Sequence, residues 1–166
     1  MNDEKKQRLA DIESIAHEVA ASLGLEIVEL VFHSQGRHSL LRIDIDRPGL
    51  PGVGIADCEN LSRALDARID ELPFFDAPYE LQVSSPGIDR PIKTDDDLRR
   101  NSQRRVTVEF EDETGKIREA AGTLAANGGD GNVTLSGEAG DIRIARERIV
   151  LMKQDVTMGK RKRNMP

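Results

Sequence analysis

The spacing of apolar residues changes character once along this 166-residue chain, near residue 84. Helix-like and strand-like stretches alternate before that point, whereas only strand-like stretches occur after residue 103. Between them lies VSSPGIDRPIKTDDD, residues 83–97, with two prolines and one glycine. A hairpin loop needs only about two to five residues, and a flexible linker would lack the prolines. The chain is therefore predicted to fold as two units joined by a stiff segment.

The N-terminal half is predicted to form a small α/β layer structure. Residues 4–23 and 55–72 have apolar residues at helical spacing. Residues 25–32 and 40–46 are strand-like and flank a Gly-containing turn, which predicts a β-hairpin. Residues 79–83, YELQV, form a further strand. The order α-β-β-α-β would bury both apolar helix faces against one side of a three-stranded sheet.

The C-terminal half shows strand signals alone. Its five segments are RRVTVEF (104–110), KIREAAGTLAA (116–126), VTLSG (133–137), GDIRIA (140–145) and RIVLMKQ (148–154). Short strands separated by Gly-rich turns are typical of small barrels, because closing a sheet removes its edge strands. We therefore expect a five-stranded β-barrel, and an α+β protein overall.

The segment between the halves has a heavily specified conformation. Ser85 should be extended because Pro86 follows it, and Gly87 permits a positive φ. Thr94 and Asp97 have the spacing of a capping box, which predicts a short helix over DDDLRR. Loops held this rigidly often carry function. A stiff hinge without a binding role is the alternative.

These patterns predict domain boundaries and a change in charge. We expect an α/β domain over residues 1–88, an interdomain segment with a short helix over 89–103, a β-barrel over 104–154, and a basic, disordered tail over 155–166. Residues 1–86 hold 8 Lys and Arg and 16 Asp and Glu, a balance of −8, and residues 87–166 hold 16 and 14, a balance of +2. This asymmetry indicates either a basic partner surface in the second half or mere drift in surface charge.

Composition narrows the class of protein. Cys58 is the sole cysteine, so no internal disulfide is possible and a reducing compartment fits. No apolar run approaches the roughly 18 residues that span a bilayer, and the charged N-terminus lacks the apolar segment of a signal peptide. We expect a soluble, cytoplasmic protein with no membrane contact.

Signals for catalysis or metal binding are weak. Serines follow the YELQV strand without the G-x-S-x-G pattern of a nucleophilic serine. His33 and His38 flank the hairpin turn and could face each other, but zinc needs three or four ligands. NGGDGN lacks the terminal acidic ligand of a calcium loop, and Cys58 lies on an apolar helix stripe as a small core residue. We therefore predict no catalytic residues, no metal site and no cofactor.

The stretch VSSPGIDRPI resembles the central motif of the RimP family of bacterial ribosome maturation factors. IADCENLSRALDARID, LRIDIDRPG, GTL, NVTL and IRIA extend the resemblance over nearly the whole chain. The resemblance implies an N-terminal domain with a type II KH-like topology and a C-terminal Sm-like five-stranded barrel.

The same resemblance implies a function. It implies a non-enzymatic role in assembly of the small (30S) ribosomal subunit, through binding of the free small subunit near the ribosomal protein beside the decoding centre. The expected partners are rRNA and that protein, and we expect a monomer. A stand-alone Sm-like RNA-binding regulator is the alternative, and such proteins usually assemble into rings.

Two stretches depart from the family pattern, and one feature of KH domains is missing. Gly54 stands where the family usually has Ser or Thr as the cap of the second helix. RRNSQRR stands where an aromatic residue and a glycine often precede the first barrel strand. The GxxG loop with which KH domains clamp nucleic acid is absent, so a KH-like topology would not imply KH-like RNA binding.

Partner-binding residues are predicted in three groups. The junction would present one rigid polar surface, and arginines just beyond it would add a basic cluster. Arg90 would either contact a phosphate or carboxylate of the partner, or tie the domains together through acidic neighbours. The tail would neutralise phosphates or act only as a solubility tail. The groups are Ser84, Ser85, Gly87, Asp89 and Arg90; Arg99, Arg100, Arg104 and Arg105; and Lys160, Arg161, Lys162 and Arg163.

Overall fold

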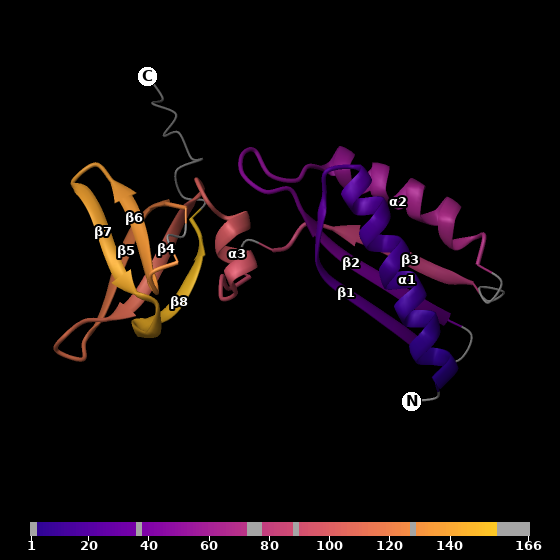
Figure 1. Cartoon of the computed structure of the whole chain (residues 1–166), viewed down its shortest axis with the longest axis horizontal. Helices are drawn as coiled ribbons and strands as arrows, with labels where there is room; N and C mark the ends of the chain where they lie inside the picture. The colour runs from indigo at the N-terminus through magenta and orange to yellow at the C-terminus, as the bar shows by residue number, and fades with distance from the viewer. Residues whose placement is uncertain (1–2, 36–37, 73–77, 88–89, 127–128, 156–166) are drawn as a thin grey trace, which may run out of the picture. The chain divides into compact units, whose positions relative to one another are not determined.

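The computed structural model describes residues 3–35, 38–72, 78–87, 90–126 and 129–155. The chain divides into two compact units, Met1–Arg47 with Pro51–Pro86, and Gly87–Pro166 with Pro48–Leu50. The first unit is mixed α/β and the second is mainly β, as Figure 1 shows, so the protein is α+β. Whether the four predicted ranges, among them 1–88 and 104–154, behave as separate domains remains a prediction.

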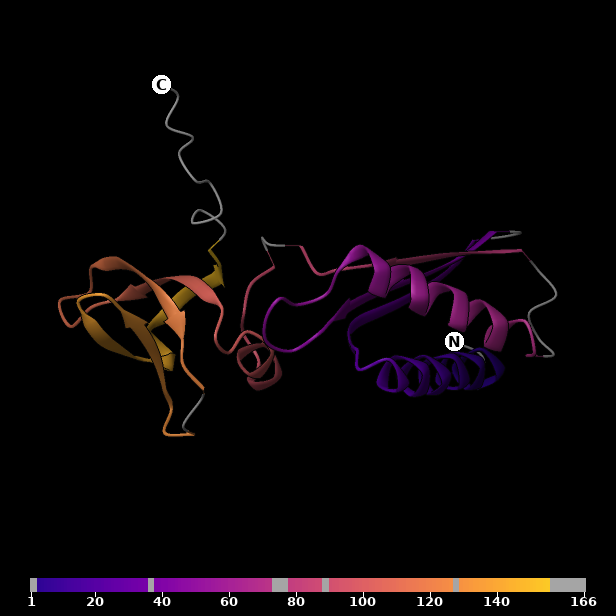
Figure 2. The same cartoon turned by 90° about the horizontal axis from the view of Figure 1, so that it is seen from above.

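The first unit has the predicted α-β-β-α-β order. Its sheet runs β1-β2-β3, with β1 antiparallel to β2 and β3 parallel to β2. Both helices lie on the same face of this sheet, side by side, as Figure 2 shows from above. The elements are α1 (Asp3–Ser22), β1 (Glu26–Gln35), β2 (His38–Asp46), α2 (Ile55–Ile69) and β3 (Tyr79–Ser84).

The core of the first unit lies between the helices and the central strand. Leu41, Ile43 and Ile45 alternate along β2, are fully buried, and pack against buried residues of both helices such as Ala16. Gly24 ends α1 with a φ of +70°, and the following N–H, of Leu25, donates to Ala20 O over 2.9 Å. This is a Schellman cap, as the helix-stop signal predicted.

The second unit is a five-stranded antiparallel sheet in the order β7-β6-β5-β4-β8. Val106, Val108, Leu124 and Leu135 are buried in its core. The elements are α3 (Asp95–Arg100), β4 (Arg105–Glu111), β5 (Ile117–Leu124), β6 (Asn132–Gly137), β7 (Gly140–Ala145), a 3-10 turn (Arg146–Arg148) and β8 (Ile149–Gln154).

This sheet is open, whereas we expected a closed barrel. Among the described residues no backbone pairing joins β7 to β8. The outer side of β8 is instead met by the segment before α3, where Ile92 N–H donates to Met152 O over 2.8 Å. Ile92 and Leu98 are buried against the sheet, so the segment that precedes and forms α3 helps to close this core.

Glycine is required inside β5 because another strand approaches closely. A Cβ at Gly122 would lie 2.8 Å from Ser136 O and 3.2 Å from Leu135 Cβ, both in the neighbouring strand β6. At the start of β4 the opposite situation holds, since Gln103 has a φ of +70° where glycine would be favoured. Gln103 falls in the RRNSQRR stretch that departs from the family pattern.

No helix within the described ranges is long and apolar enough to cross a membrane.

Candidate partner-binding surfaces

The predicted junction residues Ser84 and Ser85 belong to the first unit and have different surroundings. Ser84 Oγ–H donates to Asp44 Oδ1 over 2.9 Å, and Arg42 Nη2 donates to Asp44 Oδ2 over 2.7 Å. Asp44 is only 5% exposed, so both bonds offset the burial of its charge. The pKa of Arg42 is raised by its bond to Asp44. Both serines are exposed, but Ser84 also has a structural task on the sheet through its bond to Asp44.

Ser85 borders a groove of about 770 Å³ between the start of α2 and strand β3. We call it the α2–β3 groove. Its lining residues are Val53, Gly54, Ile55, Cys58, Glu59, Ser62, Leu81, Gln82, Val83, Ser84 and Ser85. Burial is the main cause that raises the pKa of the Cys58 thiol, with the charge of Asp57 adding to it. A raised pKa disfavours the reactive thiolate, in keeping with the prediction of an unreactive cysteine.

The start of α2 is capped through Asp57, the third residue of the helix. Gly54 N–H donates to Asp57 Oδ2 over 2.9 Å, and Arg47 Nη2 donates to Asp57 Oδ1 over 2.8 Å. The bond from Arg47 is the largest cause that lowers the pKa of Asp57, followed by the backbone bond from Gly54. A carboxylate three residues into the helix thus replaces the side-chain cap that glycine lacks.

Gly87 and Arg90 begin the second unit. Arg90 N–H donates to Gly87 O over 2.9 Å, and Arg90 is half-buried. The φ of Gly87 is not in the left-handed region, and a Cβ there would meet nothing within 4 Å. Gly87 therefore does not use the positive φ that glycine permits. Asp89, the remaining junction residue, lies outside the described residues.

Arg100 and Arg104 are buried inside the second unit. Arg100 Nη2 donates to Asp97 Oδ1 over 2.6 Å, and Arg104 Nε donates to Gly49 O over 2.9 Å. Gly49 N–H in turn donates to Arg100 O over 3.3 Å. The arginines are 7% and 8% exposed, so their guanidinium groups bond within the second unit and hold α3 and the Pro48–Leu50 segment in place. Their role in partner binding remains a prediction, and the geometry favours an internal one.

Arg99 and Arg105 are the more accessible arginines of the predicted basic cluster. Arg99 has about half of its side chain exposed and pairs with the exposed Asp96 at 3.3 Å. Arg105 Nε donates to the buried Asp155 over 3.0 Å. Exposed pairs such as Arg99–Asp96 are worth only about 0–1 kcal/mol, so a partner can replace Asp96 at small cost.

Asp97 organises the short helix α3. Its carboxylate accepts N–H bonds from Lys93 and Thr94 at 3.0 Å each, and its own N–H donates to Thr94 Oγ1. Burial alone would raise the pKa of Asp97, but the bonds from Thr94 and Lys93 and the charge of Arg100 together hold it below its usual value. This is the predicted capping box, and it fixes the residues that follow the central motif.

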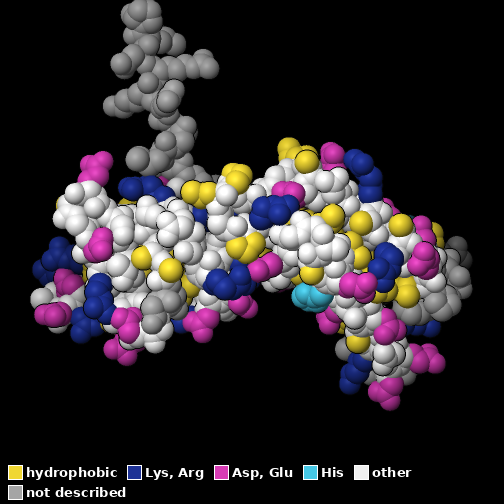
Figure 3. All heavy atoms as spheres, turned by 45° about the horizontal axis from the view of Figure 1, so that its top comes forward, with side chains coloured by type: hydrophobic (Ala, Val, Ile, Leu, Met, Phe, Trp, Pro, Cys, Tyr) yellow, Lys and Arg dark blue, Asp and Glu magenta, His cyan; other side chains and the backbone are white. Residues whose placement is uncertain are grey.

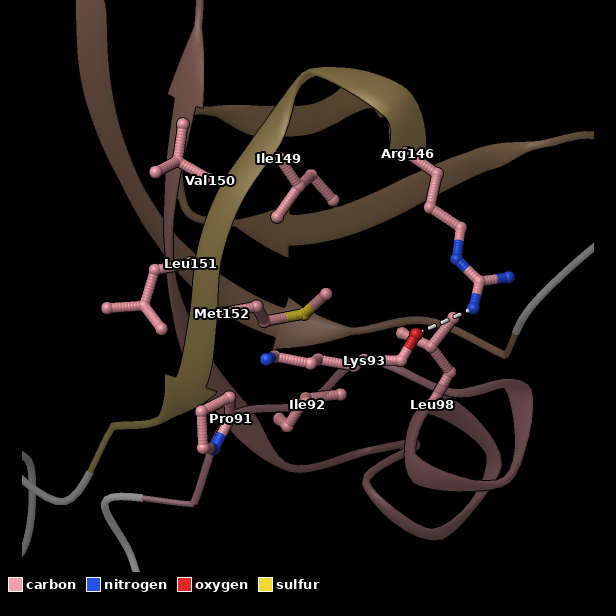
Figure 4. A pocket seen from close by; sticks show the side chains of 9 residues that line it. All are labelled: Pro91, Ile92, Lys93, Leu98, Arg146, Ile149, Val150, Leu151 and Met152. Carbon is pink, nitrogen blue, oxygen red and sulfur yellow. Dashed lines mark hydrogen bonds between the residues drawn. The ribbon is translucent and has the colours of Figure 1, made fainter.

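A small pocket of about 250 Å³ lies between this segment and β8, and Figure 4 shows its lining. Ile92, Leu98, Ile149 and Met152 give it an apolar floor. Arg146 closes one side, where its Nη2 donates to Lys93 O over 2.8 Å and its Nη1 bonds to Asp95. The pocket offers no pair of groups suited to acid–base or nucleophilic chemistry, and it belongs to the packing of α3 on the sheet.

Other candidate chemistry finds little support in the geometry. His33 pairs with Leu40 and His38 with Gln35 across the hairpin, so the two histidines are not directly opposite each other. Within the described ranges no group of three or more His, Cys, Asp or Glu is placed to hold a metal ion. On the face drawn in Figure 3, Lys and Arg side chains are interspersed with Asp and Glu over both units. Lys160, Arg161, Lys162 and Arg163 lie outside the described residues.

Sequence reasoning missed the α2–β3 groove. Its signals were the position of YELQV as the last strand of a three-stranded sheet, and the apolar Ile55 at the very start of a helix. Neither points to a groove until the sheet order is known.

Comparison with known proteins gives the family. Residues 15–89 match the family model described as the RimP N-terminal domain. A protein of Nostoc sp. named "Ribosome maturation factor RimP" is 48% identical over 84 residues, which cover 51% of this chain and 54% of that protein. A protein of the same name from Microcystis aeruginosa is 31% identical over 147 residues, covering 89% of this chain and 93% of that protein. With a match over nearly its full length, the chain belongs to the RimP family.

Proposed function

We propose that this protein is a ribosome maturation factor that binds the free small (30S) ribosomal subunit and assists its assembly. The observation that carries the proposal is the similarity to a protein named for ribosome maturation across 89% of this chain and 93% of that relative. Because a match of this length includes most of both units, the whole chain, and not one domain alone, would take part.

The proposal extends to the fold of each unit. The α-β-β-α-β order with both helices on one sheet face supports a type II KH-like topology for the first unit. The five short strands, with a helix packed beside β8, support an Sm-like barrel for the second, with an opening between β7 and β8. A relationship of fold does not by itself locate a binding surface.

The proposed mechanism is recognition without bond chemistry. A factor that binds one state of an assembling particle better than its alternatives shifts the population toward that state. Arg90, Arg99 and the tail cations Lys160–Arg163 would contact phosphates or carboxylates of rRNA or a ribosomal protein. Ser85 and Gly87 would let the partner approach the junction, while Arg100 and Arg104 would keep α3 in place. The factor would act as a cytoplasmic monomer without a cofactor.

Sedimentation of the full chain with purified ribosomal particles tests the proposal. We expect the protein to travel with free small subunits and not with joined ribosomes. Arg99→Glu should weaken binding by roughly tenfold or more if Arg99 makes a charged contact. Glu13→Lys, an exposed charge reversal on α1, is the control and should leave binding unchanged. Absence of any binding to small subunits would refute the proposal, and a ring-sized species on a sizing column would favour the stand-alone regulator.

A further inference from the structure

Strand β3 forms one edge of the sheet in the first unit. It pairs with β2 in parallel without a break, from Ser39 opposite Tyr79 to Asp44 opposite Ser84. No other described strand pairs with it. Edge strands present backbone N–H and C=O groups to solvent, and proteins usually protect them with Pro, Lys, bulges or a covering segment. Tyr79–Ser84 contains no Pro or Lys and has no bulge.

The α2–β3 groove runs along this edge and has an apolar floor. Val53, Cys58, Leu81 and Val83 are half-buried and pack against the core of the first unit. Ile55 lines the groove and is 81% exposed. An exposed, large aliphatic side chain beside an apolar groove and an open strand edge is typical of a surface that a partner covers. All of these residues belong to the first unit, so the groove is intact within it.

The charges around the groove indicate which kind of partner fits it. Of its lining residues none is Lys or Arg, and Glu59 lies on the helix wall. Glu80 lies on β3, on the sheet face opposite to the groove floor, because side chains alternate along a strand. Glu59 pairs with Arg63 at 3.5 Å, but both are exposed, so this pair is easily replaced. A nucleic acid backbone would need cations that the groove lacks.

From these observations we infer that β3 accepts an extended segment of a partner protein as an added strand in the α2–β3 groove. The segment alternates aliphatic and basic residues. Its aliphatic side chains enter the groove beside Leu81 and Val83, and its basic side chains lie beside Glu80. Backbone hydrogen bonds to β3 supply affinity, and the alternation supplies specificity. In the cell the segment would belong to a basic protein of the assembling subunit, and this assignment rests on the proposed function.

Peptide binding to the ¹⁵N-labelled full chain tests the groove directly. The probe is a capped heptapeptide that alternates Val and Lys, and its matched control carries Glu in place of Lys. We expect the Val/Lys peptide to shift the amide signals of Tyr79–Ser84 and of the first turns of α2, and to bind at least about tenfold more tightly than the Val/Glu peptide. Equal binding of the two peptides, or shifts elsewhere only, would overturn the inference.

N-methylation separates strand addition from simple charge attraction. Alternate N–H groups of an added strand point to β3, so methylating one alternate set should abolish binding and methylating the other should preserve it. Two methylated peptides that bind equally well would show that no strand is added.

Variants of the protein test the same surface. Ile55→Asp should weaken binding of the Val/Lys peptide by about fivefold to tenfold, because an aliphatic contact is lost. The variant should still fold, since Asp at the first position of a helix is well tolerated. Glu80→Lys, at an exposed position on β3, should remove the preference for Lys over Glu peptides. Glu13→Lys, with the same charge change on the exposed face of α1, is the control and should preserve that preference. Unchanged peptide binding in both Ile55→Asp and Glu80→Lys would contradict the inference.

The same variants distinguish failure of this inference from failure of the proposed function. If the wild-type chain binds small subunits and Ile55→Asp and Glu80→Lys bind them equally well, the groove is not used and the inference is overturned while the proposed function stands. If the peptides bind at β3 and the chain does not bind small subunits, the inference stands for the groove and the proposed function fails.

Discussion

Replacement of Asp97 by alanine should destabilise the second unit far more than the same replacement one residue earlier. Lys93 N–H, Thr94 N–H and Arg100 Nη2 all donate to the Asp97 carboxylate, at 3.0, 3.0 and 2.6 Å. Asp97 is 7% exposed. Its loss would remove the acceptor of two backbone donors and one partner of a buried guanidinium.

The magnitude follows from the burial of these donors. A buried donor that loses its acceptor costs roughly 1–3 kcal/mol. Arg100 keeps other interactions, and Thr94 Oγ1 still accepts the N–H of residue 97, so each loss should lie at the low end. We expect a decrease in the free energy of unfolding of about 3 kcal/mol for Asp97→Ala. Asp97→Asn keeps acceptor oxygen but loses charge, so its effect should be smaller.

Asp96→Ala is the matched control, because it removes the same group from the same helix turn. Asp96 has 73% of its side chain exposed, and its carboxylate pairs with the exposed Arg99. Its loss should cost less than about 1 kcal/mol. Urea unfolding of the full chain, followed through the amide signals of Val106 and Val108, measures the second unit specifically. Free energies for Asp97→Ala and Asp96→Ala within about 0.5 kcal/mol of each other would refute the reasoning.

Three further outcomes follow from the second unit. Gly122→Ala should destabilise the second unit by roughly 1–3 kcal/mol, because the new Cβ would lie 2.8 Å from Ser136 O. Gly137→Ala is the control and should destabilise it less in the same urea assay, because its Cβ would lie 3.7 Å from its nearest neighbour. Gln103→Gly should stabilise by up to about 1 kcal/mol by relieving a left-handed φ, and Gln103→Ala should show no such gain. The pKa of Asp97 is lowered in the folded state, so its contribution to stability is present above the ordinary carboxyl pKa of about 4 and is lost as pH falls below that value. Urea unfolding measured at a series of pH values should therefore show a smaller decrease in the free energy of unfolding with falling pH for Asp97→Asn than for wild type.

Much of the fold was predictable because local periodicity and tertiary burial agree. The alternation of Leu41, Ile43 and Ile45 with charged residues marks one buried sheet face, and these three are fully buried. Thr94 and Asp97 form the predicted cap because its chemistry is entirely local. Gly24 ends α1 for the same reason.

What could not be predicted depends on contacts between segments distant in sequence. RRNSQRR reads as a solvated basic stretch, yet Arg104 is buried because Gly49, 55 residues earlier, supplies its acceptor. Closure of the second sheet was expected from the cost of free edges, but strand spacing cannot show that Ile92 would meet β8. The α2–β3 groove likewise depends on β3 lying at the sheet edge, which the strand sequence alone does not determine.

The distribution of buried and exposed charge decides which substitutions can separate binding from folding. Arg100→Ala and Arg104→Ala remove buried hydrogen-bonded groups, so a loss of affinity in these variants would report damage to α3 as readily as a lost contact. Arg99→Glu acts on a side chain that is 51% exposed, so a loss of affinity in this variant would report on the proposed partner contact. The two units also offer different chemistry, since an acidic, apolar groove suits a basic protein segment and exposed arginines suit phosphates. If both proposals hold, salt should weaken the contacts of Arg99 more than the apolar contacts of the groove, because screening acts on exposed charges.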